Sequence, residues 1–350
     1  QGTAPLLRWG IAGAGAIARR FCRDVNQYAR GGRVVAIAAR DQGRADEFAR
    51  EQGLEFAYGS YQALAESPEV EAVYVAVIHP QHAALIRQML LAGKHVLVEK
   101  PAVTRVADWD ALVALAHERG LLLLEAMKVM CFPAMRALLQ RLPLLPAPRS
   151  LRAAFGSAPP PVGKLFDPAL DGGAAWDVGV YPLWLYAAFC ERLGLATQAP
   201  EVALDRAPGE VDLAARFSFG GPFSAGLGAS SGEDLDRDAW LSGEAWTLVI
   251  EGKWWNPQHI RWQGDTPPAA WPADIYLPVQ GGGMQHEADH FADCLRHRLL
   301  DSPWVPHALT RRVLGWVEAG QHQRVSYRRT LTPNTFLEQQ RASRRPLFLF

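Results

Sequence analysis

Three small residues near the start of the chain have the spacing of a loop that binds a dinucleotide. Gly13, Gly15 and Ala18 form a GxGxxA sequence directly after the apolar stretch 6–12. In such a loop the first glycine permits a tight turn, the second lets the backbone approach a pyrophosphate, and the small third residue allows close helix–strand packing. The pyrophosphate would lie at the N-terminus of the following helix, where free backbone amides face it. The candidate cofactor-binding residues in this segment are Gly13, Gly15, Ala16 and Ile17.

The end of the second apolar stretch discriminates between the two nicotinamide dinucleotides. A carboxylate there would bind the ribose 2′-hydroxyl of NAD, whereas a cation suits the 2′-phosphate of NADP. The stretch 34–39 is followed by Arg40 and then by Asp41. Arg40 favours NADP. NAD stays open as an alternative, because a shift of one residue would bring Asp41 to the same place.

A second motif indicates different chemistry. His286, Glu287 and His290 form HExxH, in which two imidazoles on one helix face bind zinc and the carboxylate activates a bound water. Such a site needs a third ligand, and the extended motif would require glycine and histidine further on. Cys294 follows instead, and Glu318 lies at a longer spacing than expected. A zinc hydrolase is therefore a remote alternative, and we assign no metal ligand.

The first third of the chain predicts the strands and helices that would position these residues. Its sequence alternates between short apolar runs and segments with apolar residues at helical spacing. Short apolar runs predict buried strands, and apolar residues at helical spacing predict helices between them. The apolar runs are continuous rather than alternating in polarity, as in a parallel sheet covered on both faces. The glycine loop would follow the first strand and open the first helix, which is the context its motif requires. We therefore expect a doubly wound Rossmann domain over 1–125, with strands at 6–12, 34–39, 70–78, 95–98 and 121–124.

The pattern changes after Glu125. Several prolines interrupt the chain, and polarity then alternates residue by residue in three segments, 211–219, 223–229 and 246–250. This alternation is typical of antiparallel strands with one buried face. We expect residues 126–335 to form an α/β domain with a large open, mainly antiparallel sheet that supplies the substrate site. Residues 336–350 would form a surface tail.

Composition excludes several classes of function. The chain has 350 residues, enough for two domains, and 36 basic residues balance 36 acidic ones. No excess charge would attract nucleic acid, and no apolar run reaches the ~20 residues of a membrane span. The four cysteines are scattered without a CxxC pair, which fits a reducing compartment. We expect a small-molecule ligand and a cytoplasmic location; a periplasmic one stays open because the sequence begins at Gln1.

Three further segments together resemble the glucose–fructose oxidoreductase/inositol dehydrogenase (Gfo/Idh/MocA) family. They are 75–82, 92–101 and 172–182, which contain His-Pro-Gln-His, Glu-Lys-Pro and Gly-Val-Tyr-Pro. The first and last are similar to the branch that holds dimeric dihydrodiol dehydrogenase and NADP-linked D-xylose dehydrogenase. The resemblance covers about 6–335 and implies a homodimer or higher homo-oligomer. The outer face of the second sheet would form the interface, to which Trp240, Trp246, Trp254 and Trp255 would contribute unless they pack in the core.

The resemblance also implies roles for individual residues. Lys100 would contact substrate and nicotinamide, Tyr181 would act as general acid/base, and Asp177 would line the same pocket. A free tyrosine has a pKa of about 10, so we expect the neighbouring ammonium of Lys100 to lower the pKa of Tyr181 and favour the phenolate. The cofactor site would further include Ile78, His79, Glu99 and His82, the last unless it is a packing residue.

The expected reaction is reversible NADP-linked oxidation of a secondary alcohol on a sugar, cyclitol, polyol or dihydrodiol. The alternative from another class is a non-catalytic NADP-binding sensor of the same fold, but such a protein would be expected to lose Lys100 or Tyr181. Several positions depart from the family pattern. Lys128 and its neighbours replace a Trp-Thr-Arg-Phe segment, Ile78 replaces Thr, and Asp171 replaces Gly. The resemblance therefore does not transfer any particular substrate.

Overall fold

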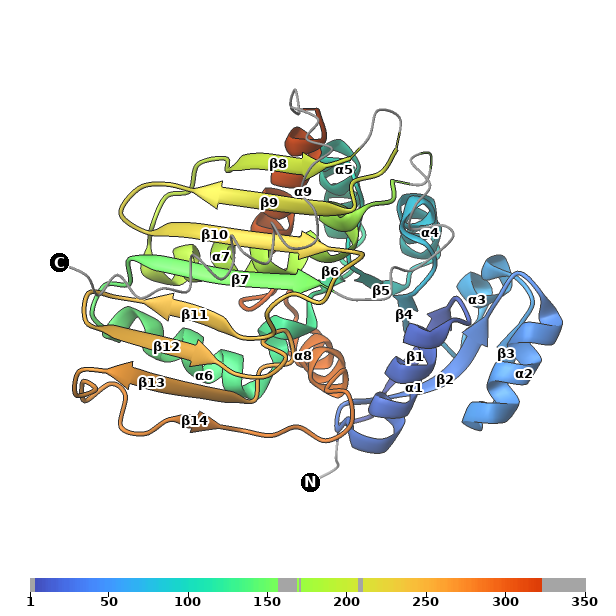
Figure 1. The fold of residues 1–350 in the computed structure, drawn as a ribbon. Helices are drawn as coiled ribbons and strands as arrows, with labels where there is room; N and C mark the ends of the chain where they lie inside the picture. Colours follow the sequence, from blue (N-terminus) through green and yellow to red (C-terminus); the bar gives the residue numbers. More distant parts are fainter. Residues whose placement is uncertain (1–3, 157–168, 170, 207–209, 323–350) are drawn as a thin grey trace.

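Two sheets form the framework of the protein, and they occupy the two halves of the view in Figure 1. The computed structural model describes residues 4–156, 169, 171–206 and 210–322. The predicted tail at 336–350 and the predicted end of the second domain lie outside these described residues. No helix in the described ranges is long and apolar enough to cross a bilayer.

The first sheet has six parallel strands in the order β3-β2-β1-β4-β5-β6, so the predicted Rossmann sheet is confirmed. The direction of winding reverses between β1 and β4, which is where doubly wound sheets bind their ligands. The prediction missed β3, because its three half-buried residues are too few to show a pattern. The strands are β1 (Leu7–Ala12), β2 (Gly32–Ala38), β3 (Phe56–Tyr58), β4 (Ala72–Val75), β5 (His95–Glu99) and β6 (Leu123–Ala126).

Helices cover both faces of this sheet. They are α1 (Ala16–Tyr28), α2 (Gln42–Gln52), α3 (Tyr61–Glu66), α4 (His82–Leu91) and α5 (Val106–Glu118). Strands β1, β2 and β4 are almost wholly buried, which explains why their sequences are continuously apolar.

The second sheet has eight strands in the order β14-β13-β12-β11-β7-β10-β9-β8. Every neighbouring pair is antiparallel except β7 with β10 in the middle, which confirms the mainly antiparallel prediction. The strands are β7 (Ser150–Gly156), β8 (Glu201–Asp205), β9 (Ala214–Phe219), β10 (Ser224–Ser230), β11 (Ala239–Ser242), β12 (Trp246–Ile250), β13 (His259–Gly264) and β14 (Ile275–Tyr276).

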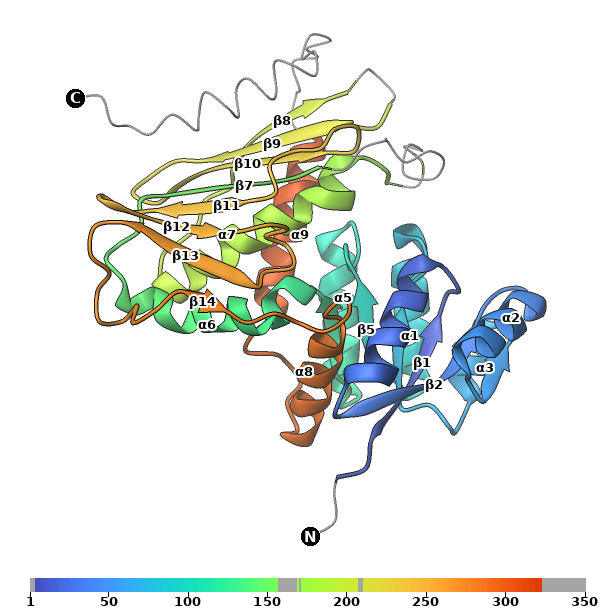
Figure 2. The ribbon, with the colours of Figure 1, turned by 60° about the horizontal axis from the view of Figure 1, so that its bottom comes forward.

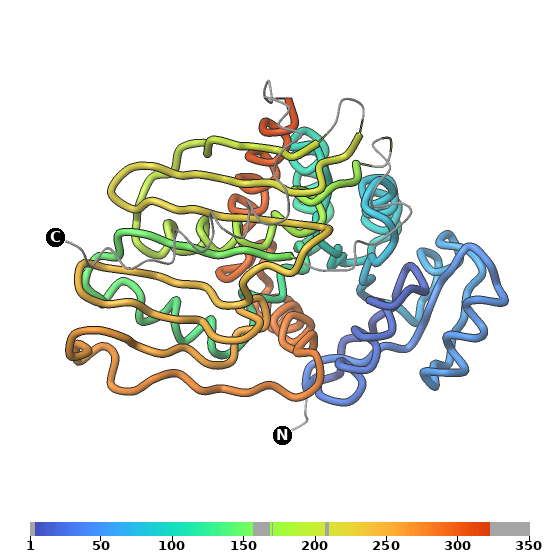
Figure 3. Tube along the Cα trace, viewed as in Figure 1, coloured from blue at the N-terminus to red at the C-terminus, as the bar shows by residue number. Residues whose placement is uncertain are grey.

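One face of the second sheet is covered by the helices α6 (Pro133–Arg141), α7 (Val180–Leu193) and α9 (His307–His322) (Figure 2). The residues of α7 are buried from Val180 to Cys190, so this helix forms the centre of the core. The chain then returns to the first domain. Helix α8 (Gln285–Arg296) lies beside α1 (Figure 3). The ring of Phe291 in α8 is 5.0 Å from the ring of Trp9 in β1. The two domains therefore share one packed interior.

The tryptophans expected at a subunit interface are mostly interior. Trp246, Trp254 and Trp255 are only 6%, 0% and 9% exposed within the single chain. The indole of Trp254 donates a hydrogen bond of 2.7 Å to the carbonyl of Ala154, because the segment after β12 folds back onto β7. The expectation for Trp254 was therefore wrong, since a side chain with no exposed surface cannot reach a partner. The homodimer itself stays a prediction.

Candidate active site

The glycine loop has the geometry that its motif predicts. Gly13 has a φ of 107°, and a Cβ at this position would lie 2.7 Å from the carbonyl oxygen of Ala76. Gly15 has open space where a Cβ would be, and it begins α1 without any side-chain cap. Ala18 is fully buried against the sheet. These residues, with Ala16 and Ile17 in the first turn of α1, fit the pyrophosphate of a dinucleotide.

The two charged residues after β2 have different environments. The carboxylate of Asp41 caps α2 and accepts hydrogen bonds from the amides of Gly43 and Arg44, at 2.7 and 3.3 Å. Arg40 is exposed and lies close to Tyr61. Burial raises the pKa of the Tyr61 hydroxyl, and the guanidinium groups of Arg40 and Arg44 oppose that rise. Two cations, Arg40 and Arg44, thus lie near Tyr61 after β2, and a 2′-phosphate bound there would face both. Arg44, which lies one helical turn further on, was not predicted from the sequence.

The three predicted catalytic residues meet, although they come from two domains. Lys100 follows β5, Asp177 lies in the π-helical turn η6 (Ala175–Gly179), and Tyr181 lies in the first turn of α7. The Lys100 ammonium donates a hydrogen bond to the backbone carbonyl of Asp177 and lies 3.6 Å from its Oδ1. It also lies 5.0 Å from the centre of the Tyr181 ring. The arrangement can hold a positive charge and a proton donor beside one reacting group.

Aromatic rings form one side of this arrangement. The Tyr181 ring stacks on Phe155 with the ring centres 5.1 Å apart, and Phe155 contacts Trp255 at 4.1 Å. Both partners come from the second sheet and the segment after β12. Tyr181 itself is only 8% exposed, so its hydroxyl is largely removed from water.

The pKa of Tyr181 is raised overall, so the lowered pKa expected for it is not found. Burial raises the pKa of Tyr181 well above its ordinary value, and the charges of Glu99 and Glu287 raise it further. Lys100 fails to reverse this because its ammonium faces the ring and hydrogen-bonds to Asp177. Tyr181 is therefore a neutral phenol, which suits a proton donor.

Comparison with known proteins gives the family. Residues 7–127 match the Gfo/Idh/MocA family model, described as an oxidoreductase family with an NAD-binding Rossmann fold. Trans-1,2-dihydrobenzene-1,2-diol dehydrogenase of Bos taurus is 34% identical over 315 residues, which cover 86% of this chain and 91% of the relative. The human enzyme of that name is 33% identical over 313 residues, covering 86% and 91%. The chain belongs to the Gfo/Idh/MocA oxidoreductase family.

Solved structures agree with this assignment. The 3-ketoreductase of Actinomadura kijaniata with NADP and TDP-benzene matches at a TM-score of 0.76 and 26% identity, covering 90% of this chain and 97% of that one. Aldose–aldose oxidoreductase of Caulobacter crescentus matches in fold at a TM-score of 0.76 and 22% identity, covering 91% and 97%. These structures show the fold of this member of an oxidoreductase family, and the ketoreductase among them contains NADP.

Two histidines that follow β4 support loops in this Gfo/Idh/MocA site. His82 is buried, and its ring nitrogens lie 2.9 Å from the carbonyls of Pro101 and Val77. It thus braces the loop after Lys100 and has no ring nitrogen left for the cofactor. His79 is half-buried after Ile78, and its Nε2 lies 2.6 Å from the carbonyl of Asp171. Burial lowers the pKa of His79, so its ring is neutral.

Two acidic side chains, Glu99 and Glu287, influence the site, and only Glu99 was assigned to it from the sequence. Glu99 accepts a hydrogen bond from the hydroxyl of Tyr74. Glu287 is buried, and among the described residues neither of its carboxylate oxygens has a hydrogen-bond partner. Burial raises the pKa of Glu287, Glu99 raises it further, and Lys128 opposes the rise. Lys128, noted as a departure from the family pattern, therefore balances acidic charge near Tyr181.

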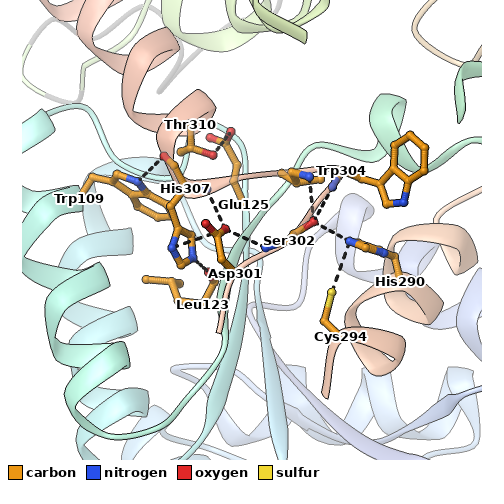
Figure 4. A network of polar contacts seen from close by, with 11 residues as sticks. Trp109, Leu123, Glu125, His290, Cys294, Asp301, Ser302, Trp304, His307 and Thr310 are labelled. Atoms are coloured by element: carbon orange, nitrogen blue, oxygen red, sulfur yellow. Dashed lines mark hydrogen bonds and ion pairs between the residues drawn. The ribbon is translucent and has the colours of Figure 1, made fainter. Parts of the chain in front are cut away.

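The HExxH residues have separate environments. His290 is buried, and its Nε2 lies 2.6 Å from the Ser302 hydroxyl and 3.5 Å from the sulfur of Cys294 (Figure 4). His286 instead borders a cavity of about 570 Å³ beside Arg30. Within the described ranges, no three His, Cys, Asp or Glu side chains are grouped to hold a metal ion. The two histidines of the motif therefore have different surroundings, and no third ligand is grouped with them in this part of the chain.

Proposed function

We propose that this protein interconverts a secondary alcohol and a carbonyl on a sugar, cyclitol, polyol or dihydrodiol, with Tyr181 as general acid/base and Lys100 as its cationic partner. The observation that carries the proposal is the convergence of Lys100, Asp177 and Tyr181 from two domains. The names of the relatives, dihydrodiol dehydrogenases and a 3-ketoreductase, support the substrate class.

The bound nicotinamide supplies or accepts the hydride, and the protein's residues handle the proton and the charge. In reduction, Tyr181 donates its proton to the oxygen of the substrate carbonyl. Lys100 offsets the negative charge that develops on that oxygen, and Asp177 holds the ammonium in place. In oxidation the same groups act in reverse, with Tyr181 as the proton acceptor.

The test is NADP reduction, followed by absorbance, across aldoses, inositols and trans-dihydrobenzenediols, with NAD in parallel. Turnover of at least one alcohol with NADP is expected. An enzyme that binds NADPH but turns over none of these alcohols, and reduces none of the matching ketones, would contradict the proposal and favour the sensor alternative.

The raised pKa of Tyr181 predicts opposite pH profiles for the two directions. Reduction needs the neutral phenol, which persists throughout the neutral range because the pKa lies above about 10. Oxidation needs a proton acceptor, so its kcat should rise by up to about tenfold per pH unit below that pKa. Initial rates between pH 6 and 10 in both directions check this. A rate of oxidation that is maximal at pH 7 and flat above it would contradict a raised pKa.

Replacing Arg40 by alanine should weaken NADP selectively. A charge-assisted hydrogen bond contributes about 1.5–3 kcal/mol, so Kd for NADPH should rise roughly 10- to 100-fold while that for NADH is unchanged. Quenching of protein fluorescence by each cofactor measures both constants. Arg50→Ala is the matched control, because it removes an exposed arginine from the other end of α2. If Arg40→Ala weakens the binding of NADH and NADPH equally, Arg40 does not bind the 2′-phosphate.

A further inference from the structure

One buried carboxyl group connects the two catalytic segments. Glu125 lies in β6 and is only 2% exposed. Its Oε2 accepts a hydrogen bond of 2.8 Å from the amide of Ala102, and its Oε1 accepts one of 2.8 Å from the indole of Trp184. The hydroxyl of Thr310 in α9 is 3.5 Å from Oε1, a long contact (Figure 4).

The two close donors come from the segments that carry the catalytic groups. Ala102 lies two residues after Lys100 in the loop that follows β5. Trp184 lies three residues after Tyr181 in α7, and residues three apart are neighbours on a helix surface. His82 also contacts this loop, because its ring lies beside the carbonyl oxygens of Pro101 and Ala102. Glu125 thus links a loop of the first domain to a helix of the second.

The chemistry of the site favours a carboxyl group over any other side chain. Each of its oxygens faces one N–H donor, so both oxygens must accept. Glutamine has one acceptor oxygen, and its amide nitrogen would place N–H groups against a donor. A buried carboxyl is costly unless its partners compensate it, and an apolar side chain would fill this space at lower cost. The cost is explained if the group holds Lys100 and Tyr181 at a defined separation.

We propose that Glu125 is a positioning residue that sets the placement of Lys100 relative to Tyr181 across the domain boundary. The inference rests on the roles proposed for these two residues. Glu125 is buried and acts through the amide of Ala102 and the indole of Trp184. A displacement of about 1 Å between reacting groups lowers rates by on the order of 100-fold, which is the scale of effect that a positioning residue has.

The test compares Glu125→Gln with wild type, using the alcohol that wild type turns over fastest in the panel above. We expect kcat to fall on the order of 100-fold while Kd for NADPH and KM for the alcohol change less than about threefold. A residue that only stabilises the fold would lower the melting temperature and leave kcat of the folded enzyme unchanged. Thr310→Val is the matched control, because it removes the long contact to the same carboxyl and should leave kcat unchanged.

Trp184→Phe tests the same link from the other side, and it decides the question if Glu125→Gln does not fold. It keeps an aromatic ring but removes the donor to Oε1, so kcat should fall on the order of 10-fold. The double variant should lose little more than Glu125→Gln alone, because both changes break one connection. Unchanged kcat in folded Glu125→Gln, or in Trp184→Phe, overturns the proposal. If Tyr181→Phe and Lys100→Met retain turnover, it is the proposed function that fails.

Discussion

Replacing Tyr181 by phenylalanine should lower kcat by about 10²–10⁴-fold in both directions, the range that a general acid/base contributes. The ring and its stacking on Phe155 would be kept, and only the proton donor would be lost. Steady-state kinetics with NADP and NADPH, together with NADPH binding, measure the effect. Binding of NADPH should be unchanged.

Tyr186→Phe is the matched control for this experiment. Tyr186 lies on the same helix, and its buried hydroxyl donates a hydrogen bond of 2.7 Å to the carbonyl of Phe223. Its loss should cost about 1 kcal/mol of folding free energy and leave kcat unchanged. If both variants lose activity to the same degree, Tyr181 acts through helix stability rather than as a proton donor.

Replacing Lys100 by methionine should lower kcat by about 10²–10³-fold, the loss seen when one stabiliser of a developing oxyanion is removed. Methionine keeps much of the length of the side chain but removes the ammonium that bonds to Asp177 and lies over the Tyr181 ring. The carbonyl and carboxylate of Asp177 would lose their cation, so KM for the alcohol should rise as well. Kinetics at saturating NADP separate the two effects.

Lys94→Met provides the control for Lys100→Met. Lys94 lies just before the same strand, where its buried ammonium donates to the carbonyls of Ser67 and Val70 at 2.6 and 2.7 Å. Its replacement should lower the melting temperature, because two buried carbonyls lose their donor, but kcat of the folded protein should be unchanged. A Lys100→Met enzyme with wild-type kcat would eliminate the cationic partner from the proposed mechanism.

The cofactor half of this protein could be predicted from the sequence alone, because its signals are local. Gly13, Gly15 and Ala18 act within one strand–turn–helix unit, and the backbone geometry of that unit determines which side chains fit. Arg40 and Asp41 were ambiguous from the sequence. The start of α2 resolved them, since Asp41 is the residue that caps that helix.

The second domain was predicted in kind but not in detail. Alternating polarity indicated β9, β10 and β12, whereas the shorter or irregular strands carried no pattern of their own. Trp254 illustrates the limit. Its sequence context suits either an interface or a core, and only the fold of the segment after β12 made it interior.

The charge states and partners of the site depend on tertiary structure. The pKa of Tyr181 responds to burial and to Glu99, Glu287 and Asp177, which come from three separate elements. The link from Glu125 to Ala102 and Trp184 likewise joins residues 23 and 59 positions apart. The sequence by itself thus predicted a dinucleotide cofactor, the two-domain class and the candidate reacting groups. Their ionisation and separation were decided by the fold, because desolvation and Coulombic interactions depend on distance in space rather than along the chain.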